Sequence, residues 1–293
     1  MNSASRLRAL LKAEAMVIAP GAYDGLTAKL VAQAGFPAVY MTGAGTSVSH
    51  GYPDFGLLTM SEMVENAARI VRSVDVPVIA DADTGYGNEL NVFRTVQEYE
   101  GRGVAAIHIE DQVSPKKCGH LDDKEIVPRE DYIAKIRAAM AARRDSDFMI
   151  IARTDARAAA GLDEAVARAN AALAAGADMA FVEAPQTMDE LAAVPQRVAG
   201  PCLLNVVRGG KTPEIDLRRA QQMGYRLAIV PGLLLKAVIG ACDEMLAELK
   251  ANLVHPVPRT DMTVRGAFNR VGADEWDTLR TRFRDSPERR AAE

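Results

Sequence analysis

The sequence is poor in cysteine, in aromatic side chains and in long apolar runs, and each scarcity excludes a class of protein. Three cysteines among 293 residues are too few, and odd in number, for a disulfide-stapled secreted domain. No apolar stretch approaches the roughly 20 residues that cross a bilayer. The first residues also lack the apolar core and cleavage site of a secretory signal. We therefore expect a cytoplasmic protein with no membrane partner.

An excess of basic charge is also missing. Lys and Arg number 35 against 39 Asp and Glu, the formal net charge is −4, and no basic stripe is present. Nucleic acid is therefore not an expected partner. Apolar residues nevertheless make up 48% of the chain. This is ample material for a core, and the length suits one large domain or two small ones.

Eight short apolar runs recur along the chain, and segments of helical periodicity lie between them. Each run is continuous rather than alternating, as in parallel strands that are buried on both faces. The runs are 16–19, 38–41, 77–80, 105–109, 148–152, 179–182, 202–205 and 227–230. Eight strands alternating with helices over roughly 230 residues predict a (β/α)8 TIM barrel of the α/β class. A doubly wound open sheet is the alternative, less favoured because no domain break interrupts the series.

Amphipathic helices are predicted over 59–73, 88–101, 128–143 and 163–175. Asp163 is the expected N-cap of the last of these. Glycines are expected to stop helices before the next strand at four positions, Gly35, Gly103, Gly176 and Gly224.

Beyond the eighth run, the pattern predicts a long helix over 233–253, a break at His255-Pro-Val-Pro258 and a last helix over 272–285. That last helix holds Trp276, the only tryptophan. We expect one barrel domain over 1–293 whose two C-terminal helices pack on a partner subunit.

Polar side chains follow the apolar runs, at the barrel end where active sites of this fold lie. Asp81 and Asp83 are two residues apart, so both point to one face of an extended strand, and Glu110 ends the next run. These carboxylates would repel one another without a cation, and hard oxygen ligands suit Mg²⁺ or Mn²⁺. We predict a metal site, the alternative being one aspartate that caps a helix and another that is solvated.

Two features favour an anionic substrate. Arg153 ends the fifth run, and its guanidinium suits a substrate carboxylate, a salt bridge to Glu110 or Asp83, or both. The segment Thr42-Gly-Ala-Gly45 offers backbone N–H groups to a carboxylate, although it suits a tight strand–helix turn equally well.

A loop longer than usual, Ser114-Pro-Lys-Lys-Cys-Gly-His120, follows the fourth run. It sets Cys118 between two lysines and a histidine, neighbours that are expected to lower a thiol pKa. Cys118 is a candidate proton donor at carbon or a candidate nucleophile, the alternative being an incidental cysteine on a basic loop. Cys202 and Cys242 are expected in the core, and His108 is expected either in the core or near the site.

Four segments together resemble the isocitrate lyase and phosphoenolpyruvate mutase superfamily. They are Asp81-Ala-Asp-Thr-Gly-Tyr-Gly87, Ile109-Glu-Asp-Gln112, Lys116-Lys-Cys-Gly-His120 and Ala152-Arg-Thr-Asp155. The third segment is typical of the carbon–carbon lyases, in the methylisocitrate lyase and 2,3-dimethylmalate lyase branch. The resemblance implies a barrel whose eighth helix is swapped between subunits, a homotetramer built from dimers, Mg²⁺, and cleavage of a 2-hydroxy carboxylic acid.

The same resemblance implies the residues of a metal and substrate site. Asp81 would hold the metal directly, while Asp54, Asp83 and Glu110 would act mostly through water. The 2-oxo acid portion of the substrate would be bound by five residues, Thr42, Gly43, Ala44, Arg153 and Asn205.

Catalytic roles are implied in the same way. Cys118 would protonate the departing carboxylic acid, and Tyr40 would lie near the breaking bond. Lys116, Gly119 and His120 would belong to a closing loop, and Glu183 would support both that loop and the substrate.

The chain departs from the branch at two places. Methylisocitrate lyases continue Cys-Gly-His-Arg-Pro, whereas this chain reads Cys118-Gly-His-Leu-Asp122, which weakens the case for a third substrate carboxylate. Residues 205–213 resemble the dimethylmalate lyase and petal death protein group, with Arg208 where glutamate is usual. Pro231 resembles the lyases more than the oxaloacetate hydrolases.

We therefore expect a Mg²⁺-dependent lyase that releases a 2-oxo acid such as pyruvate from an alkylmalate or, second, from 2-methylisocitrate. An oxaloacetate hydrolase or decarboxylase, or a phosphonopyruvate-type enzyme of the superfamily, is the alternative. A Schiff-base aldolase using Lys116, Lys117 or Lys211, and a non-catalytic barrel, are more remote.

Overall fold

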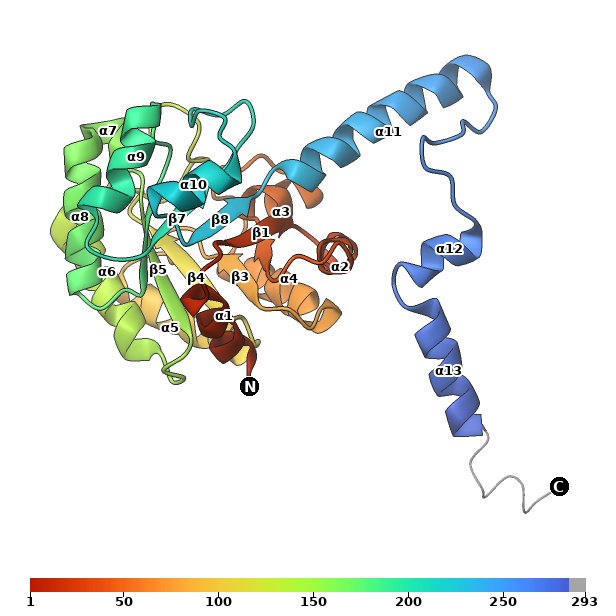
Figure 1. Ribbon diagram of the computed structural model, residues 1–293, viewed down its shortest axis with the longest axis horizontal. Coiled ribbons are helices and arrows are strands. Elements are labelled where there is room, and N and C mark those ends of the chain that lie inside the picture. Colours follow the sequence, from red (N-terminus) through yellow and green to blue (C-terminus); the bar gives the residue numbers. More distant parts are fainter. Residues whose placement is uncertain (285–293) are drawn as a thin grey trace. The chain divides into compact units, whose positions relative to one another are not determined.

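The computed structural model describes residues 1–284 and contains a closed barrel of eight parallel strands, each paired with its neighbours in chain order (Figure 1). The strands are β1 (Val17–Ala22), β2 (Val39–Met41), β3 (Val78–Asp81), β4 (Ala106–Glu110), β5 (Met149–Thr154), β6 (Met179–Val182), β7 (Cys202–Asn205) and β8 (Leu227–Val230). The pairing of β1 with β8 closes the barrel. This confirms the predicted (β/α)8 fold and excludes the open sheet.

The chain divides into two compact units, 1–237 and 238–293, the second described as far as residue 284. The helices within the first unit are α1 (Ser3–Lys12), α2 (Gly25–Gln33), α3 (Gly43–Ser49), α4 (Met60–Ser73), α5 (Glu89–Gly101), α6 (Arg129–Ala142), α7 (Ala156–Ala160), α8 (Leu162–Ala174), α9 (Met188–Arg197) and α10 (Leu217–Met223).

Local sequence sets most helix ends. Thr59 and Asn88 form capping boxes at the starts of α4 and α5. The four glycines predicted to stop helices all adopt positive φ, between 81° and 109°. The predicted N-cap Asp163 is wrong: Gly161 occupies the N-cap of α8, and the Asp163 carboxylate instead accepts from Arg197 at 2.7 Å.

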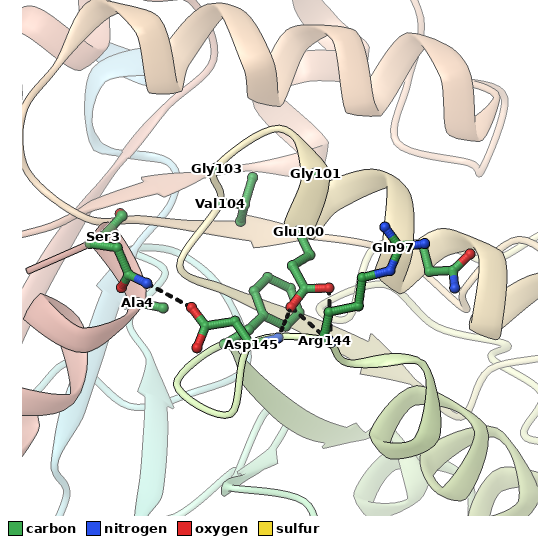
Figure 2. Close-up of a pocket in the computed structure, with 11 residues that line it drawn as sticks. Ser3, Ala4, Gln97, Glu100, Gly101, Gly103, Val104, Arg144 and Asp145 are labelled. Carbon is green, nitrogen blue, oxygen red and sulfur yellow. Dashed lines mark hydrogen bonds between the residues drawn. The ribbon is translucent and has the colours of Figure 1, made fainter.

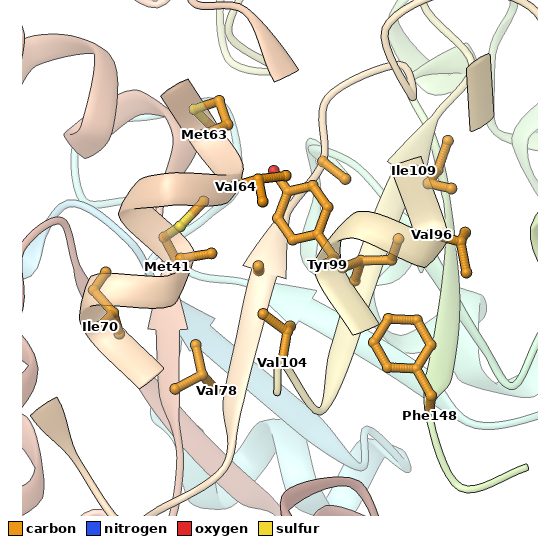
Figure 3. Close-up of a cluster of buried hydrophobic side chains, with 14 of the residues drawn as sticks. Met41, Met63, Val64, Ile70, Val78, Val96, Tyr99, Val104, Ile109 and Phe148 are labelled. Carbon is orange, nitrogen blue, oxygen red and sulfur yellow. The ribbon is translucent and has the colours of Figure 1, made fainter. Parts of the chain in front are cut away.

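Alternation along the strands separates two apolar layers. Outward-facing side chains such as Met41 and Val78 pack with Met63, Tyr99 and other helix residues (Figure 3). Inward-facing residues fill the barrel interior, among them Tyr40, Ile79, Ile151, Phe181 and Leu203, and Leu7 of α1 belongs to this inner cluster. Because successive side chains alternate, a residue two positions beyond an inner apolar residue also faces inward.

The second unit contains most of α11 (Leu233–Asn252), then α12 (Val264–Asn269) and α13 (Ala273–Arg284). None of these helices has a buried residue, and Trp276 and Phe283 are more than two-thirds exposed. Cys242 is exposed on α11, so the prediction that it lies in the core is wrong, whereas Cys202 is buried as expected. The last residue of the predicted helix 272–285 lies outside the described residues.

No helix within residues 1–284 has the length and apolar character needed to cross a membrane.

Candidate active site

Strand alternation brings the predicted polar residues together at one end of the barrel. Six of them follow, by two positions, a strand residue whose side chain faces into the barrel. These six are Thr42, Asp81, Glu110, Arg153, Glu183 and Asn205. All six are less than 9% exposed. Five of the six, all except Glu110, line a cavity of about 170 Å³ together with the loop that carries Cys118.

Most of the residues predicted for the site line this cavity. The structure places eleven of them on its wall: Tyr40, Thr42, Ala44, Asp54, Asp81, Cys118, Gly119, His120, Arg153, Glu183 and Asn205. Four others lie behind the wall and touch its residues. Gly43 donates its N–H to Asp81 (3.2 Å), Asp83 donates its N–H to Asp81 (3.0 Å), Glu110 contacts Arg153, and Lys116 contacts Asp54.

A larger cavity, about 430 Å³, lies elsewhere and contains none of the predicted residues (Figure 2). Its polar groups bind one another: Glu100 accepts hydrogen bonds from the backbone of Arg144 and Asp145, and Asn2 donates to Asp145. The predicted residues therefore gather at the smaller cavity at the strand ends and not at the larger one.

The acidic half of the site is buried and held together by Lys116. Its ammonium contacts Asp54 and lies 2.9 Å from Asp83, and these carboxylates raise the Lys116 pKa although burial opposes them. Burial also opposes the low pKa of Asp81, which His108, Lys116 and Arg153 together hold below its usual value. The pKa of Asp83 is raised, by burial above all.

The donor set fits a divalent cation that keeps part of its water shell. Within residues 1–284 no three His, Cys, Asp or Glu side chains converge closely enough to hold a metal by themselves. Mg²⁺ is commonly bound by one or two carboxylates, with water and substrate filling the remaining positions. Both carboxylate oxygens of Glu110 are buried without accepting a hydrogen bond, although Arg153 approaches one of them, so hard acceptor capacity is left over.

Arg153 joins the acidic half to the opposite wall. Its guanidinium lies 2.9 Å from Glu110, forms two hydrogen bonds with Asp155 (2.9 and 3.2 Å) and lies 3.4 Å from Glu183. The predicted salt bridge to Glu110 is therefore present. A cation fixed in this way is positioned to bind a substrate carboxylate without reorganisation.

The loop that carries Cys118 is closed over the cavity. Its ends are paired by an antiparallel bridge between Gln112 and Ile126, and the Cys118 N–H donates to the Asp54 carbonyl at 3.1 Å. A Cβ on Gly119 would lie 2.6 Å from both Arg153 and Glu183, so only glycine permits this approach.

Lys124 fastens the same loop from behind. Its buried ammonium donates to Asp155 at 2.7 Å and also to the Gly119 carbonyl. Sequence reasoning missed Lys124, because its partner Asp155 lies 31 residues away and no local pattern connects them.

The expected lowering of the Cys118 pKa is wrong. Burial raises the pKa of this thiol, and the nearby Asp54 carboxylate adds to the effect. The lysines are occupied elsewhere, since Lys116 pairs with Asp54 and Asp83, and the Lys117 ammonium donates to the carbonyl of Asp123. A protonated thiol at the cavity wall suits a proton donor better than a nucleophile.

His108 lies beneath Tyr40, inside the barrel. Its Nε2 is 2.8 Å from the Tyr40 hydroxyl, and burial lowers its pKa to about 4, so the ring is neutral. The Tyr40 hydroxyl also lies 3.4 Å from Asp81, and burial with that carboxylate raises its pKa. Both expectations for His108 are thus met, since it is buried and adjoins the site.

The far wall of the cavity was not predicted. It is formed by residues after β7 and β8, namely Val207, Pro231, Gly232, Leu235 and Lys236. Pro231 was noted in the sequence only as a family likeness, and the others follow no recognisable catalytic pattern.

Buried carboxylates, an arginine and a thiol around one cavity at the strand ends are features of an active site in an enzyme of the (β/α)8 class. The particular family follows from comparison with known proteins. Residues 7–250 match the family described as phosphoenolpyruvate phosphomutase, and the chain belongs to the PEP mutase/isocitrate lyase superfamily. This confirms the resemblance found in the four segments.

Two named relatives are similar over most of the chain. The 2,3-dimethylmalate lyase of Eubacterium barkeri is 49% identical over 251 residues, 85% of this chain and 87% of that protein. The 2-methylisocitrate lyase of Aeropyrum pernix is 45% identical over 243 residues, 83% of this chain and 78% of that protein. The chain is thus an enzyme of this superfamily, and the predicted class, carbon–carbon lyase, is that of these relatives.

Solved structures agree in fold. A 2,3-dimethylmalate lyase structure has a TM-score of 0.91 at 44% identity, covering 95% of this chain and 94% of that one. Oxaloacetate acetylhydrolase bound to 3,3-difluorooxalacetate has a TM-score of 0.93 at 38% identity and 98% coverage of both. Phosphonopyruvate hydrolase in complex with oxalate and Mg²⁺ has a TM-score of 0.87 at 33% identity, covering 97% and 99%. Members of the superfamily therefore bind Mg²⁺.

Proposed function

We propose that this chain is a Mg²⁺-dependent lyase that cleaves an alkyl-substituted malate into a 2-oxo acid such as pyruvate and a carboxylic acid. The observation that carries the proposal is the half-buried Cys118 thiol, which lines the same cavity as Asp81 and Arg153. A thiol held protonated beside an anion-binding site suits the protonation of a carbon centre.

The metal would be held by Asp81 directly, with Asp54, Asp83 and Glu110 acting mostly through water. The bound cation, Mg²⁺ or alternatively Mn²⁺, would supply stabilisation of the negative charge on the oxygens of the 2-oxo acid portion. Lys116 balances part of the carboxylate charge through its contacts with Asp54 and Asp83.

The substrate would be oriented by groups on the opposite wall. Arg153 and Asn205 would bind the 2-oxo acid portion, together with the β2–α3 segment of Thr42, Gly43 and Ala44. Thr42 is the N-cap of α3, so its backbone and hydroxyl are fixed by the helix that follows.

The reaction breaks the bond between the hydroxyl-bearing carbon and its neighbour. The hydroxyl proton leaves to a base, the C–C electron pair remains on the departing acid, and the Cys118 thiol gives that carbon its proton. Tyr40 would lie near this bond. Lys116, Gly119 and His120 would keep the loop closed with the support of Glu183, so that water is excluded while the carbanion exists.

An alkyl substituent suits the far wall of the cavity better than a third carboxylate does. Val207, Pro231 and Leu235 are apolar and lie on the β7–β8 side. The neighbouring Lys236 ammonium donates a hydrogen bond to the carbonyl of Arg208.

The resemblance also implies a homotetramer with the eighth helix swapped between subunits. The apolar side chains exposed on α11, α12 and α13, among them Ile239, Phe268 and Trp276, support an interface there. A cytoplasmic location stays a prediction.

The test is a release assay for 2-oxo acids, with Mg²⁺ and with EDTA. The panel is 2,3-dimethylmalate, 2-methylmalate, 2-methylisocitrate and oxaloacetate. We expect Mg²⁺-dependent pyruvate from 2,3-dimethylmalate or 2-methylmalate. Oxalate plus acetate from oxaloacetate alone would instead assign the hydrolase, the alternative that the likeness to oxaloacetate acetylhydrolase supports.

A further inference from the structure

The catalytic loop meets a tight turn at the end of β7. The backbone N–H of Lys211 donates to Nδ1 of His120 at 3.0 Å, and the Lys211 ammonium donates to the Leu121 carbonyl at 3.2 Å and to Asp122. Three consecutive residues of the loop are thus bound by one residue of the turn. None of these contacts involves a predicted metal ligand.

The contact with the backbone fixes the proton of the His120 ring. An amide N–H can only donate, so Nδ1 of His120 must be the bare, accepting nitrogen. In the neutral ring the proton is then on Nε2, which lies 3.4 Å from Glu183. Burial lowers the pKa of His120 and favours this neutral form.

The turn itself is built to allow the approach. Gly210 donates its N–H to the Val207 carbonyl at 3.0 Å, and Gly209 has a φ of 73°, a conformation that glycine adopts without strain. A Cβ on Gly210 would lie 2.5 Å from Nδ1 of His120. Any side chain at position 210 therefore competes with His120 for the same space.

We propose that the turn of residues 207–211 is the docking site of the catalytic loop. Gly210 and Lys211 are positioning residues that hold His120 in its Nε2–H form and keep Cys118 at the cavity. The same strand end supplies Asn205, so substrate binding and loop closure share one element. The assignment of Cys118 and His120 to the reacting end rests on the proposed function, but the contacts themselves do not.

Gly210→Ala tests whether this turn holds the catalytic loop. Gly101→Ala is the matched control, because a Cβ at position 101 meets nothing within 4 Å. The readout is the rate of iodoacetamide alkylation of Cys118 in the ligand-free enzyme, followed by peptide mass spectrometry. A cysteine-containing reference peptide added to every sample provides the internal standard. We expect alkylation of Cys118 about tenfold faster in Gly210→Ala, as for the loss of one hydrogen bond that holds the loop closed.

The control variant should keep the wild-type rate of Cys118 alkylation, and the melting temperature shows whether Gly210→Ala is folded. Unchanged protection of Cys118 in a folded Gly210→Ala enzyme would overturn the proposal. Lys211→Met, which removes the ammonium but keeps the backbone donor, should give a smaller increase.

The ring proton is measured separately by ¹⁵N NMR of histidine-labelled enzyme, with the His120 signal assigned from a His120→Gln sample. We expect the Nε2–H form in the wild type and a mixture of forms in Gly210→Ala. A wild-type ring protonated on Nδ1 would contradict the contact with Lys211. Because neither readout uses a substrate, an inactive substrate panel would leave both results valid.

Discussion

Replacement of Lys124 by methionine should separate closure of the loop from the binding of substrate. The Lys124 side chain is 1% exposed and Asp155 is fully buried, and the lysine joins Asp155 to the Gly119 carbonyl. Removing one partner of a buried ion pair typically costs about 3–5 kcal/mol. Asp155 keeps two hydrogen bonds from Arg153 and donates its own N–H to Asp111, so we expect a loss of stability of about 3 kcal/mol.

Part of that loss of stability affects only the equilibrium between the closed and the open loop. A hydrogen bond from a charged donor contributes about 1.5–3 kcal/mol, and losing the one to Gly119 would raise the open fraction of the loop by about 10- to 150-fold. Because an open loop carries Cys118 away from the cavity, kcat should fall more than KM rises. The assays are urea unfolding and steady-state kinetics on the substrate identified by the panel.

Arg226→Met is the matched control. The Arg226 guanidinium also donates to backbone carbonyls, those of Leu11 and Ala13, but it precedes β8 at the opposite end of the barrel. It should lose stability and keep kcat. Equal effects of the two variants on kcat, after correction for the folded fraction, would refute a specific role of Lys124 in closing the loop.

Three further outcomes are expected. Cys118→Ser should abolish turnover while equilibrium dialysis still detects Mg²⁺ and pyruvate binding, and near-full activity in this variant would eliminate Cys118 as the acid. Asp81→Ala should lower Mg²⁺-dependent turnover about 10³-fold, since metal stabilisation is worth several kcal/mol; an unchanged response to Mg²⁺ would refute the metal assignment. Burial raises the pKa of Cys118 above the ordinary 9.0, so the donor is protonated below that pH and its contribution is lost as pH rises through the raised pKa. The pH dependence of Cys118 alkylation should therefore have its midpoint above 9.0, and a midpoint below 9.0 would contradict the raised pKa.

Strand periodicity made much of the site predictable. Val78 and Ile79 face opposite sides of β3, and the same alternation carries Asp81 into the barrel mouth. The same rule places Arg153 two residues beyond Ile151. A regular strand transmits orientation along the chain, so residue spacing alone locates such side chains in space.

The contacts of the loop that carries Cys118 could not be predicted from strand alternation. Cys118 sits among lysines in the sequence, but the fold turns one toward Asp54 and the other toward the Asp123 carbonyl, and burial then decides the direction of the thiol pKa. Lys124 and Lys211 meet partners that are 31 and about 90 residues away. Irregular backbone has no fixed period, so such pairings follow only from the folded structure.

The central claim is a Mg²⁺-dependent carbon–carbon cleavage that ends with protonation by Cys118. It is tested most directly by running the reaction with 2,3-dimethylmalate in D₂O and examining the products by NMR, the propionate as its ester with a single enantiomer of a chiral alcohol. We predict pyruvate and propionate, the latter with one deuterium delivered to a single face of C2, only when Mg²⁺ is present and not with Cys118→Ser. Propionate deuterated equally on both faces, or formed at the same rate without Cys118, would contradict the account.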